Sequence, residues 1–136
     1  MTIEQLNILC KNTMIEHLGI EYIEIGSGKL IAKMGVNHRT VQPMKRLHGG
    51  ALLALAESVG SAGSMALVNP DEFMVLGTEI NATHTSYTDE KEVYGVGTLI
   101  HQGKSQHIWQ IRVEDKTGKL ISICRMTNRI LPITKK

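Results

Sequence analysis

The sequence has few aromatic residues and no large excess of charge of either sign. Its 136 residues include one Trp, one Phe and three Tyr, so aliphatic residues and methionine must fill the core. The formal net charge is only +2, with acidic and basic residues interspersed. A nucleic-acid-binding protein typically carries a strongly basic face, so no nucleic-acid partner is expected. The length predicts one domain spanning residues 1–136.

Cysteines and long apolar runs are also scarce. Cys10 and Cys124 show no CxxC spacing, and we expect each to be a small buried hydrophobe or a surface thiol, not half of a disulfide. No charged segment followed by an apolar run opens the sequence, and no apolar stretch reaches membrane-spanning length. A soluble, cytoplasmic protein without a membrane partner is therefore expected.

The hydrophobic pattern of the first 36 residues predicts a helix followed by a strand pair. Apolar residues at spacings of three and four predict an amphipathic helix over residues 2–17, with Thr2 as its N-cap. Two strands are predicted at 20–25 and 29–36. The glycine-containing turn at 26–28 can supply the positive φ that a tight hairpin needs.

The rest of the chain predicts one long helix and four more strands. Residues 37–47 are polar and form a loop, and the long helix begins at His48-Gly49-Gly50 and ends before Asn69-Pro70. Turns every ten to fifteen residues then indicate an antiparallel meander. We expect an α+β domain in which one curved antiparallel sheet wraps around the buried helix. The predicted strands of the meander are 74–86, 92–101, 106–115 and 119–131.

A glutamate stands in the middle of this apolar helix. Nearly every residue from 51 to 67 is Ala, Leu, Val, Met, Gly or Ser, and a helix that is apolar all round must be buried. Burial without a cation would raise the pKa of Glu57, as expected of a general base or a nucleophile. Two structural readings remain open: Glu57 lies at the solvent edge of the helix, or it pairs with Arg46, Arg125 or Arg129.

The start of the long helix offers backbone amides to a ligand. Glycine lets a ligand approach closely, and the first amides of a helix have no intrahelical partner, which suits a developing oxyanion near Gly49. The alternative is that the Gly49-Gly50 pair only lets the helix cross a strand closely. Ser61 lies one turn beyond Glu57, where it either positions a water or allows close helix packing.

The spacing along the helix limits how these groups act together. Gly49 and Glu57 are eight residues apart, or roughly 12 Å along the axis. An attacking group and an oxyanion donor must both lie within about 3 Å of the reacting carbonyl. Two antiparallel copies of the helix related by a two-fold axis can pair Gly49 of one with Glu57 of the other. If both residues are catalytic, the protein is expected to be an obligate homodimer with two interfacial sites.

Three sequence segments resemble the hotdog-fold thioesterases. They are the run QP…LHGGALLALAES…GS within 42–64, GTEINATH at 77–84, and HQGKSQHIWQIRVEDKTGKL at 101–120. The likeness extends over about residues 18–131 and is to the branch with the phenylacetate-pathway and the menaquinone- or enterobactin-pathway thioesterases. It implies an α+β hotdog fold that dimerises through the long helix and often forms a homotetramer. It also implies hydrolysis of acyl-coenzyme A thioesters, commonly aromatic ones such as 1,4-dihydroxy-2-naphthoyl-CoA, without metal or cofactor.

The resemblance assigns catalytic roles to matching positions. Glu57 matches the catalytic carboxylate, acting as nucleophile or as base on water. Gly49 matches the residue whose backbone N–H polarises the thioester carbonyl. Gln42 and His48 match polar groups beside the thioester, and Ser61 matches the position that orients the hydrolytic water.

The resemblance also assigns residues that bind the rest of the substrate. His84 matches a residue close to the acyl or pantetheine channel. The loop along the nucleotide and pantetheine arm corresponds to Gly103, Lys104, Ser105, Gln106 and His107. Lys104 is offset from the Arg of the related thioesterases. Arg125 and Arg129 are further candidates for phosphate contacts, or these basic side chains are simply solvated. His38, His101 and His107 lack metal-ligand spacing, and no metal site is expected.

Two other functions remain open at the level of sequence. A non-catalytic acyl-ligand binding module keeps the same fold and pocket, because fold alone does not fix function. Such a module would be expected to lose Glu57, Gln42 or Gly49, and all three are present. A thioesterase acting on acyl-carrier-protein substrates is the other alternative. The side chains that either shape an acyl pocket or belong to ordinary core are Met65, Leu67, Val68 and Met74.

Overall fold

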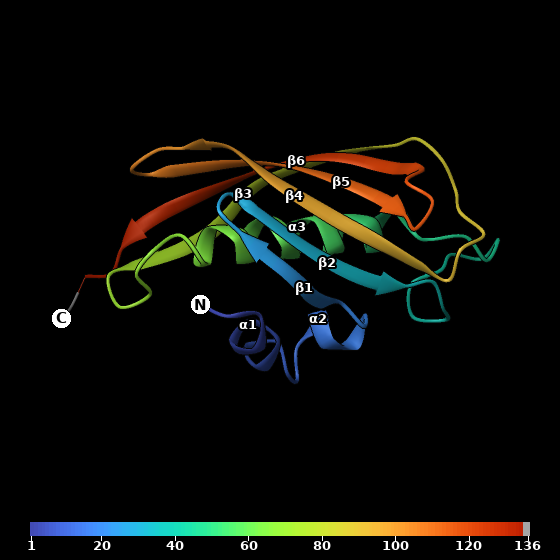
Figure 1. The fold of residues 1–136 in the computed structure, drawn as a ribbon, viewed down its shortest axis with the longest axis horizontal. Helices are drawn as coiled ribbons and strands as arrows, with labels where there is room; N and C mark the ends of the chain where they lie inside the picture. Colours follow the sequence, from blue (N-terminus) through green and yellow to red (C-terminus); the bar gives the residue numbers. More distant parts are fainter. Residues whose placement is uncertain (135–136) are drawn as a thin grey trace.

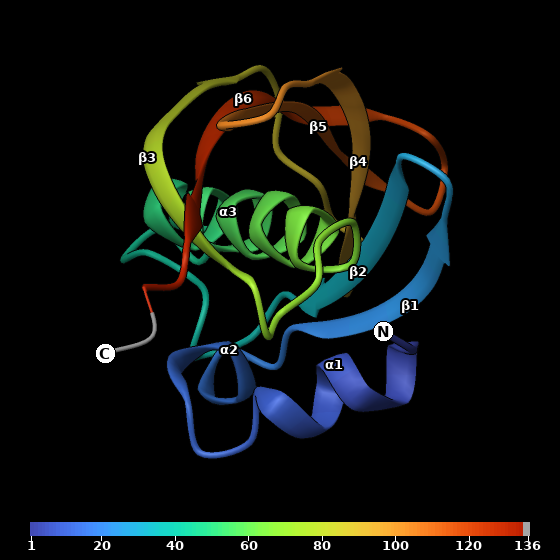
Figure 2. The ribbon, with the colours of Figure 1, turned by 90° about the vertical axis from the view of Figure 1, so that its left-hand side faces the viewer.

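The computed structural model describes residues 1–134 and shows a curved antiparallel sheet of six strands around one long helix (Figure 1). Figure 2 shows the sheet curling around α3, with the N-terminal helices beneath it. This arrangement confirms the predicted α+β hotdog fold with a central helix. The elements are α1 (Ile3–Leu9), α2 (Met14–His17), β1 (Glu21–Gly26), β2 (Lys29–Gly35), α3 (Gly49–Met65), β3 (Phe73–His84), β4 (Glu92–Gln102), β5 (Gln106–Asp115) and β6 (Leu120–Pro132).

The order of the strands differs from a simple meander. The sheet runs β1-β2-β4-β5-β6-β3, so β3 pairs with β6 and not with its neighbour in sequence, β4. Residues 85–91 are too long a connection for a tight hairpin, and they carry the chain from the edge strand β3 past β6 and β5 to β4. The prediction of a four-strand meander was therefore wrong for β3. As a consequence, β1 and β3 form the two edges of the sheet.

The predicted N-terminal helix is divided into two. Thr2 is the N-cap, as predicted, and its side chain and that of Gln5 form a capping box. The helix ends at Leu9, and Asn12 adopts a left-handed φ of 60°, which no α-helix continues through. The prediction of one helix over 2–17 was wrong because Asn readily takes this conformation and turns the chain. None of the helices within residues 1–134 combines the length and apolarity needed to cross a membrane.

Small residues let α3 lie close to the sheet. Its N-cap is His48, whose Nδ1 accepts a hydrogen bond from the Gly50 N–H at 2.8 Å. A Cβ at Gly63 would lie 2.6 Å from the Trp109 ring, and one at Gly60 would lie 2.7 Å from a methionine sulfur. Glycine is therefore required at both positions for this packing distance. Trp109, at 1 % exposure, fills the space between α3 and β5.

A β-bulge interrupts the alternation of β3. The register with β6 shifts between Gly77 and Glu79, so the regular alternation of side chains between the two faces of the sheet is interrupted there. Leu76 is consequently 44 % exposed while Ile80 packs against the core, although an unbroken strand would place both on one face. The predicted strand over 74–86 is therefore present but is interrupted by a bulge. The bulge leaves Gly77 facing α3.

Candidate active site

Glu57, on α3, lines a cavity of about 270 Å³. Ten of the seventeen residues of α3 are buried, but Glu57 is exposed in the single chain. None of the ion pairs within residues 1–134 includes Glu57, and Arg46 instead pairs with Asp89. Both the expected burial and the salt-bridge reading were therefore wrong for the single chain.

The cavity around Glu57 has one wall from α3 and one from the N-terminal residues. Ser61 lies in it together with Glu57, as expected from their one-turn spacing. Tyr22 closes it from β1 and donates from its hydroxyl to the Ser58 carbonyl at 3.1 Å. Burial raises the pKa of the Tyr22 phenol and of the Cys10 thiol, so both stay uncharged. The remaining lining residues are Leu6, Leu9, Met14, Ile15, Ala54, Ala62 and Met65.

The carboxylate of Glu57 lies against the backbone of β3 at Gly77. A Cβ at this position would be 2.9 Å from Glu57 Oε1 and 2.8 Å from Met126 Cε. Real side chains do not approach so closely, so only glycine leaves room for the carboxylate in its present place. Glu57 is thereby held next to an edge strand of the sheet.

Gly49 lies in a different, smaller cavity at the start of α3. This cavity measures about 100 Å³ and is shared with His84, Leu52 and Ile121. His84 Nε2 faces Gly49 closely, since a Cβ there would be only 2.8 Å from it. His84 Nδ1 is 2.9 Å from the Ser122 hydroxyl, which fixes the ring. Within one chain, Gly49 and Glu57 thus open into separate spaces, consistent with their spacing along the helix.

Gln42 and His48 sit near the start of α3 and line neither of these two cavities. Gln42 Oε1 accepts from the Met44 N–H at 2.5 Å, so its carbonyl end is engaged within the loop. The His48 ring caps the helix through Nδ1, which leaves Nε2 as its free nitrogen. Gln42 is half-buried and His48 is exposed.

The predicted coenzyme A loop joins β4 to β5. Lys104, Ser105 and Gln106 are exposed, whereas His107 is 2 % exposed and lies 3.0 Å from the Ser64 hydroxyl. No residue of Gly103–His107 lines the cavity of Glu57 or that of Gly49. The structure therefore brings together Glu57 with Ser61, and Gly49 with His84, but not the loop with either pair.

A buried hydrogen-bond network fixes the protonation of His107. The Ser64 hydroxyl accepts from Trp109 Nε1 at 2.9 Å and from Asn128 Nδ2 at 2.8 Å. These two donors occupy its lone pairs, so the hydroxyl proton points to His107 Nδ1 and the imidazole proton resides on Nε2. Burial lowers the pKa of His107, with a smaller contribution from the nearby His101. His107 thus joins the end of α3 to the sheet as a neutral imidazole.

The sequence model of the thioesterase superfamily matches residues 44–122, which include α3 and its glycine-rich start. The chain belongs to the thioesterase superfamily. A thioesterase from Pseudomonas aeruginosa is 37 % identical, with a TM-score of 0.94 over 98 % of this chain and 96 % of that one. A Haemophilus influenzae thioesterase is 36 % identical, with a TM-score of 0.94 over 99 % and 94 % of the two chains. This protein is accordingly a thioesterase of the hotdog fold.

A Staphylococcus aureus relative adds a comparison of spacing. Its structure is 33 % identical to this thioesterase, with TM-scores of 0.85 and 0.84 over 88 % of this chain and 99 % and 98 % of that one. It has been solved with a glutamate and with a glutamine replaced by alanine, at positions fifteen residues apart. Gln42 and Glu57 of this thioesterase are also fifteen residues apart.

Two parts of the site of this thioesterase, its N-terminal wall and Gly77, were absent from the sequence predictions. Leu9 and Met14 line the Glu57 cavity, although the sequence indicated only that they lie on a helix. Gly77 stands in the GTEINATH segment, but nothing local indicates that it would face Glu57. Both contributions depend on tertiary packing. Within residues 1–134, no group of three or more His, Cys, Asp and Glu side chains is gathered closely enough to hold a metal ion.

Proposed function

We propose that this thioesterase hydrolyses acyl-coenzyme A thioesters through Glu57. The observation that carries the proposal is a carboxylate without an ion-pair partner among the described residues, facing an otherwise uncharged cavity and held in place at Gly77. As a base, Glu57 takes a proton from water, the hydroxide adds to the carbonyl, and the C–S bond breaks to release the thiolate, which takes up the proton. As a nucleophile, its carboxylate adds to the carbonyl and the C–S bond breaks to release the thiolate, which leaves an anhydride between Glu57 and the acyl group; water then cleaves the anhydride into the carboxylic acid and the free Glu57 carboxylate.

The oxyanion is held by the Gly49 N–H of a partner subunit in a homodimer. β3 is a twelve-residue edge strand, and its Met74 and Leu76 are 43 % and 44 % exposed. Long, apolar edge strands pair readily with another chain. Two-fold pairing of β3 with β3 makes the two α3 helices antiparallel and brings Gly49 of one chain toward Glu57 of the other. A second pairing into a homotetramer belongs to the same proposal.

The remaining residues act around this pair. Ser61 shares the cavity of Glu57 and orients the hydrolytic water. Gln42, His48 and His84 lie around the helix start, where they contact the thioester and the pantetheine arm. Among the loop residues Gly103, Lys104, Ser105 and Gln106, the exposed Lys104 supplies positive charge to the coenzyme A phosphates, and His107 supports the loop from inside. The acyl group is a bulky aromatic one, of which 1,4-dihydroxy-2-naphthoyl is the example that the sequence resemblance favours.

Thiol release from a panel of acyl-CoAs, monitored with Ellman's reagent, tests the chemistry. Glu57→Gln should lower kcat by several orders of magnitude and leave the affinity for a non-hydrolysable acyl-CoA analogue nearly unchanged, because the amide neither attacks nor takes a proton. Equal turnover by Glu57→Gln and the wild type would refute the assignment. Binding without thiol release by the wild type would favour the non-catalytic module. Turnover confined to acyl-carrier-protein thioesters would reject coenzyme A as the carrier.

The role of the Gly49 amide has its own pair of variants. Gly49 is the first helical residue, and His48 before it has φ −68° and ψ 134°, a conformation compatible with a following proline. Gly49→Pro therefore removes the N–H with little damage to the helix, and Gly49→Ala places the same Cβ beside His84 while keeping the N–H. Loss of one oxyanion donor costs about 100- to 1,000-fold in kcat. A loss of that size in Gly49→Pro relative to Gly49→Ala supports the role, and equal rates exclude it.

A further inference from the structure

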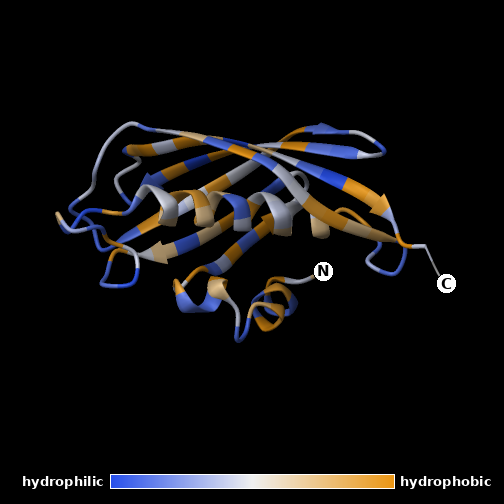
Figure 3. Ribbon diagram, turned by 180° about the vertical axis from the view of Figure 1, so that it is seen from behind, coloured by the Kyte–Doolittle hydropathy of each residue, from blue (hydrophilic) through white to orange (hydrophobic). Residues whose placement is uncertain are grey.

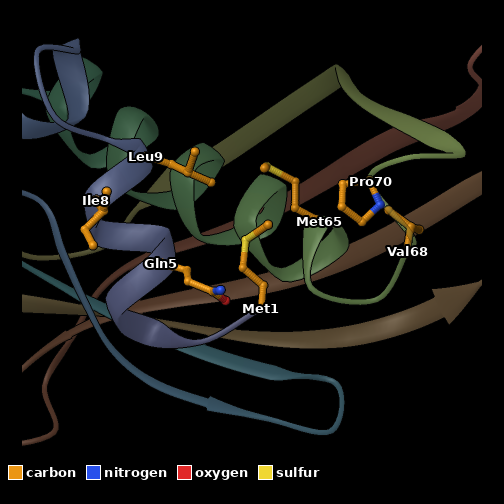
Figure 4. Close-up of a pocket in the computed structure, with 7 residues that line it drawn as sticks. All are labelled: Met1, Gln5, Ile8, Leu9, Met65, Val68 and Pro70. Carbon is orange, nitrogen blue, oxygen red and sulfur yellow. The ribbon is translucent and has the colours of Figure 1, made fainter.

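The N-terminal segment, residues 1–17, forms one wall of a groove that begins at Glu57. The cavity of Glu57 measures about 270 Å³, and a second cavity of about 430 Å³ shares Leu9 and Met65 with it. Figure 4 shows Leu9 on α1 opposite Met65 on α3, with Val68 and Pro70 farther along the chain after the helix. The two cavities together therefore form one groove between α1 and α3.

The groove offers an apolar surface that the single chain leaves uncovered. Apart from Glu57, the first cavity is lined by uncharged side chains, because burial keeps Tyr22 and Cys10 protonated. Leu9 and Met14 are 58 % and 63 % exposed, and Figure 3 shows apolar (orange) bands beside polar (blue) ones on the N-terminal helices. Contiguous exposed apolar surface beside a polar group marks a ligand-binding groove or an interface.

The position of Glu57 distinguishes between these two possibilities. Glu57 and Met65 are eight residues apart on α3, so the groove runs roughly 12 Å along the helix from the carboxylate. A thioester carbonyl held at Glu57 would direct its acyl group into this groove, where the flexible Met65 adapts to its shape. A second chain that filled the whole groove from Leu9 to Met65 would instead leave no room for that acyl group.

We propose that the N-terminal segment and α3 together bind the acyl group of the substrate, and that Leu9 and Met65 select a bulky apolar acyl group over a small one. This inference rests on the proposed function, since it takes Glu57 as the group that acts on the thioester carbonyl. It makes α1, which contributes no catalytic residue, the element that sets acyl specificity. Contact with Leu9 stabilises the transition state for hydrolysis of a thioester with a large acyl group more than the transition state for an acetyl thioester.

The test compares acetyl-, hexanoyl-, benzoyl- and 2-naphthoyl-CoA as substrates of two Leu9 variants. Leu9→Ala should lower kcat/KM for 2-naphthoyl-CoA about tenfold and leave acetyl-CoA unchanged, since a lost hydrophobic contact is worth about 10- to 200-fold in discrimination. Leu9→Trp should fill the groove and reverse the preference toward acetyl-CoA. Ile100→Ala on β4 is the matched control, because Ile100 is 50 % exposed and lines neither cavity.

The outcomes separate this inference from the proposed function. Equal changes for all four substrates, or changes matched by Ile100→Ala, would overturn the inference while the thioesterase mechanism stands. If a Leu9 variant changed in molecular mass by light scattering but kept the acyl preference of the wild type, the groove would be assigned to a second copy of the chain. That result would also overturn the inference. If the wild type released no thiol from any substrate, the proposed function would fail. In that case, calorimetry with the non-hydrolysable phenacyl-CoA would test the acyl-binding role of the groove on its own. Loss of phenacyl-CoA binding in Leu9→Trp but not in Ile100→Ala would support this role, and unchanged binding in Leu9→Trp would overturn it.

Discussion

One methyl group added at Gly77 tests how closely the position of the Glu57 carboxylate is fixed. The new Cβ would lie 2.9 Å from Glu57 Oε1, whereas ordinary contacts begin at 3.4 Å, so the carboxylate must retreat by about 0.5 Å. A displacement of about 1 Å can lower a rate about 100-fold, and half of that displacement corresponds to about tenfold. We expect Gly77→Ala to lower kcat about tenfold, measured by thiol release at saturating substrate.

The fold should tolerate this change. Both neighbours of the new Cβ are the far ends of flexible side chains, Glu57 Oε1 and Met126 Cε, so the melting temperature should change little. Gly26→Ala at the end of β1 is the matched control, because its Cβ would meet the nearest atom at 4.0 Å. An unchanged kcat in Gly77→Ala, or an equal loss in Gly26→Ala, would refute the reasoning. In a Glu57→Gln background the Gly77 substitution should have no further effect, since the two act on one interaction.

Three further predictions concern stability. Hydrogen bonds from Thr117 and Thr88 lower the pKa of Asp115 to about 2. The ionised carboxylate therefore stabilises the fold above the unfolded pKa of 3.8, and this stabilisation is lost as the pH falls toward 2. The difference in melting temperature between the wild type and Asp115→Asn should narrow below about pH 4. Burial lowers the pKa of His107 from 6.5, so the wild type should lose stability as the pH falls below about 6.5. When thermal melting is followed from about pH 8 to about pH 5, His107→Asn should lack that pH dependence. Ser64→Ala leaves two buried donors without their acceptor and should cost about 3 kcal/mol in urea denaturation, whereas a cost near zero would mean that water replaces the hydroxyl.

Most of the secondary structure follows from local patterns in the sequence. The start of α3 at Gly49 and the ends of β4 and β5 were predicted closely, because glycine, proline and polar turns mark these boundaries. The place of β3 was not, since strand order depends on where the long connection 85–91 carries the chain. The bulge after Gly77 also escaped prediction, because alternation alone gives no sign of an inserted residue.

The candidate site was predictable where it depends on helix geometry and unpredictable where it depends on packing. The one-turn spacing of Glu57 and Ser61 placed both in one cavity, and the eight-residue spacing placed Gly49 in another. An apolar helix indicates burial but does not say which element covers it, so the sequence left the exposure of Glu57 in one chain open as one alternative to burial or a salt bridge. The groove wall from Leu9 was missed for the same reason.

A site shared between two subunits is the central claim, and mixing two inactive variants tests it most directly. Glu57→Gln and Gly49→Pro chains are unfolded together, refolded at equal concentration, and assayed for thiol release. In a mixed dimer, one of the two sites combines an intact Glu57 with an intact Gly49 from the other chain. If subunits pair at random, half of the dimers are mixed and each has one working site. The account predicts recovery to about a quarter of the wild-type rate. Activity no higher than that of the separate variants, with mixed dimers confirmed by native mass spectrometry, would contradict it.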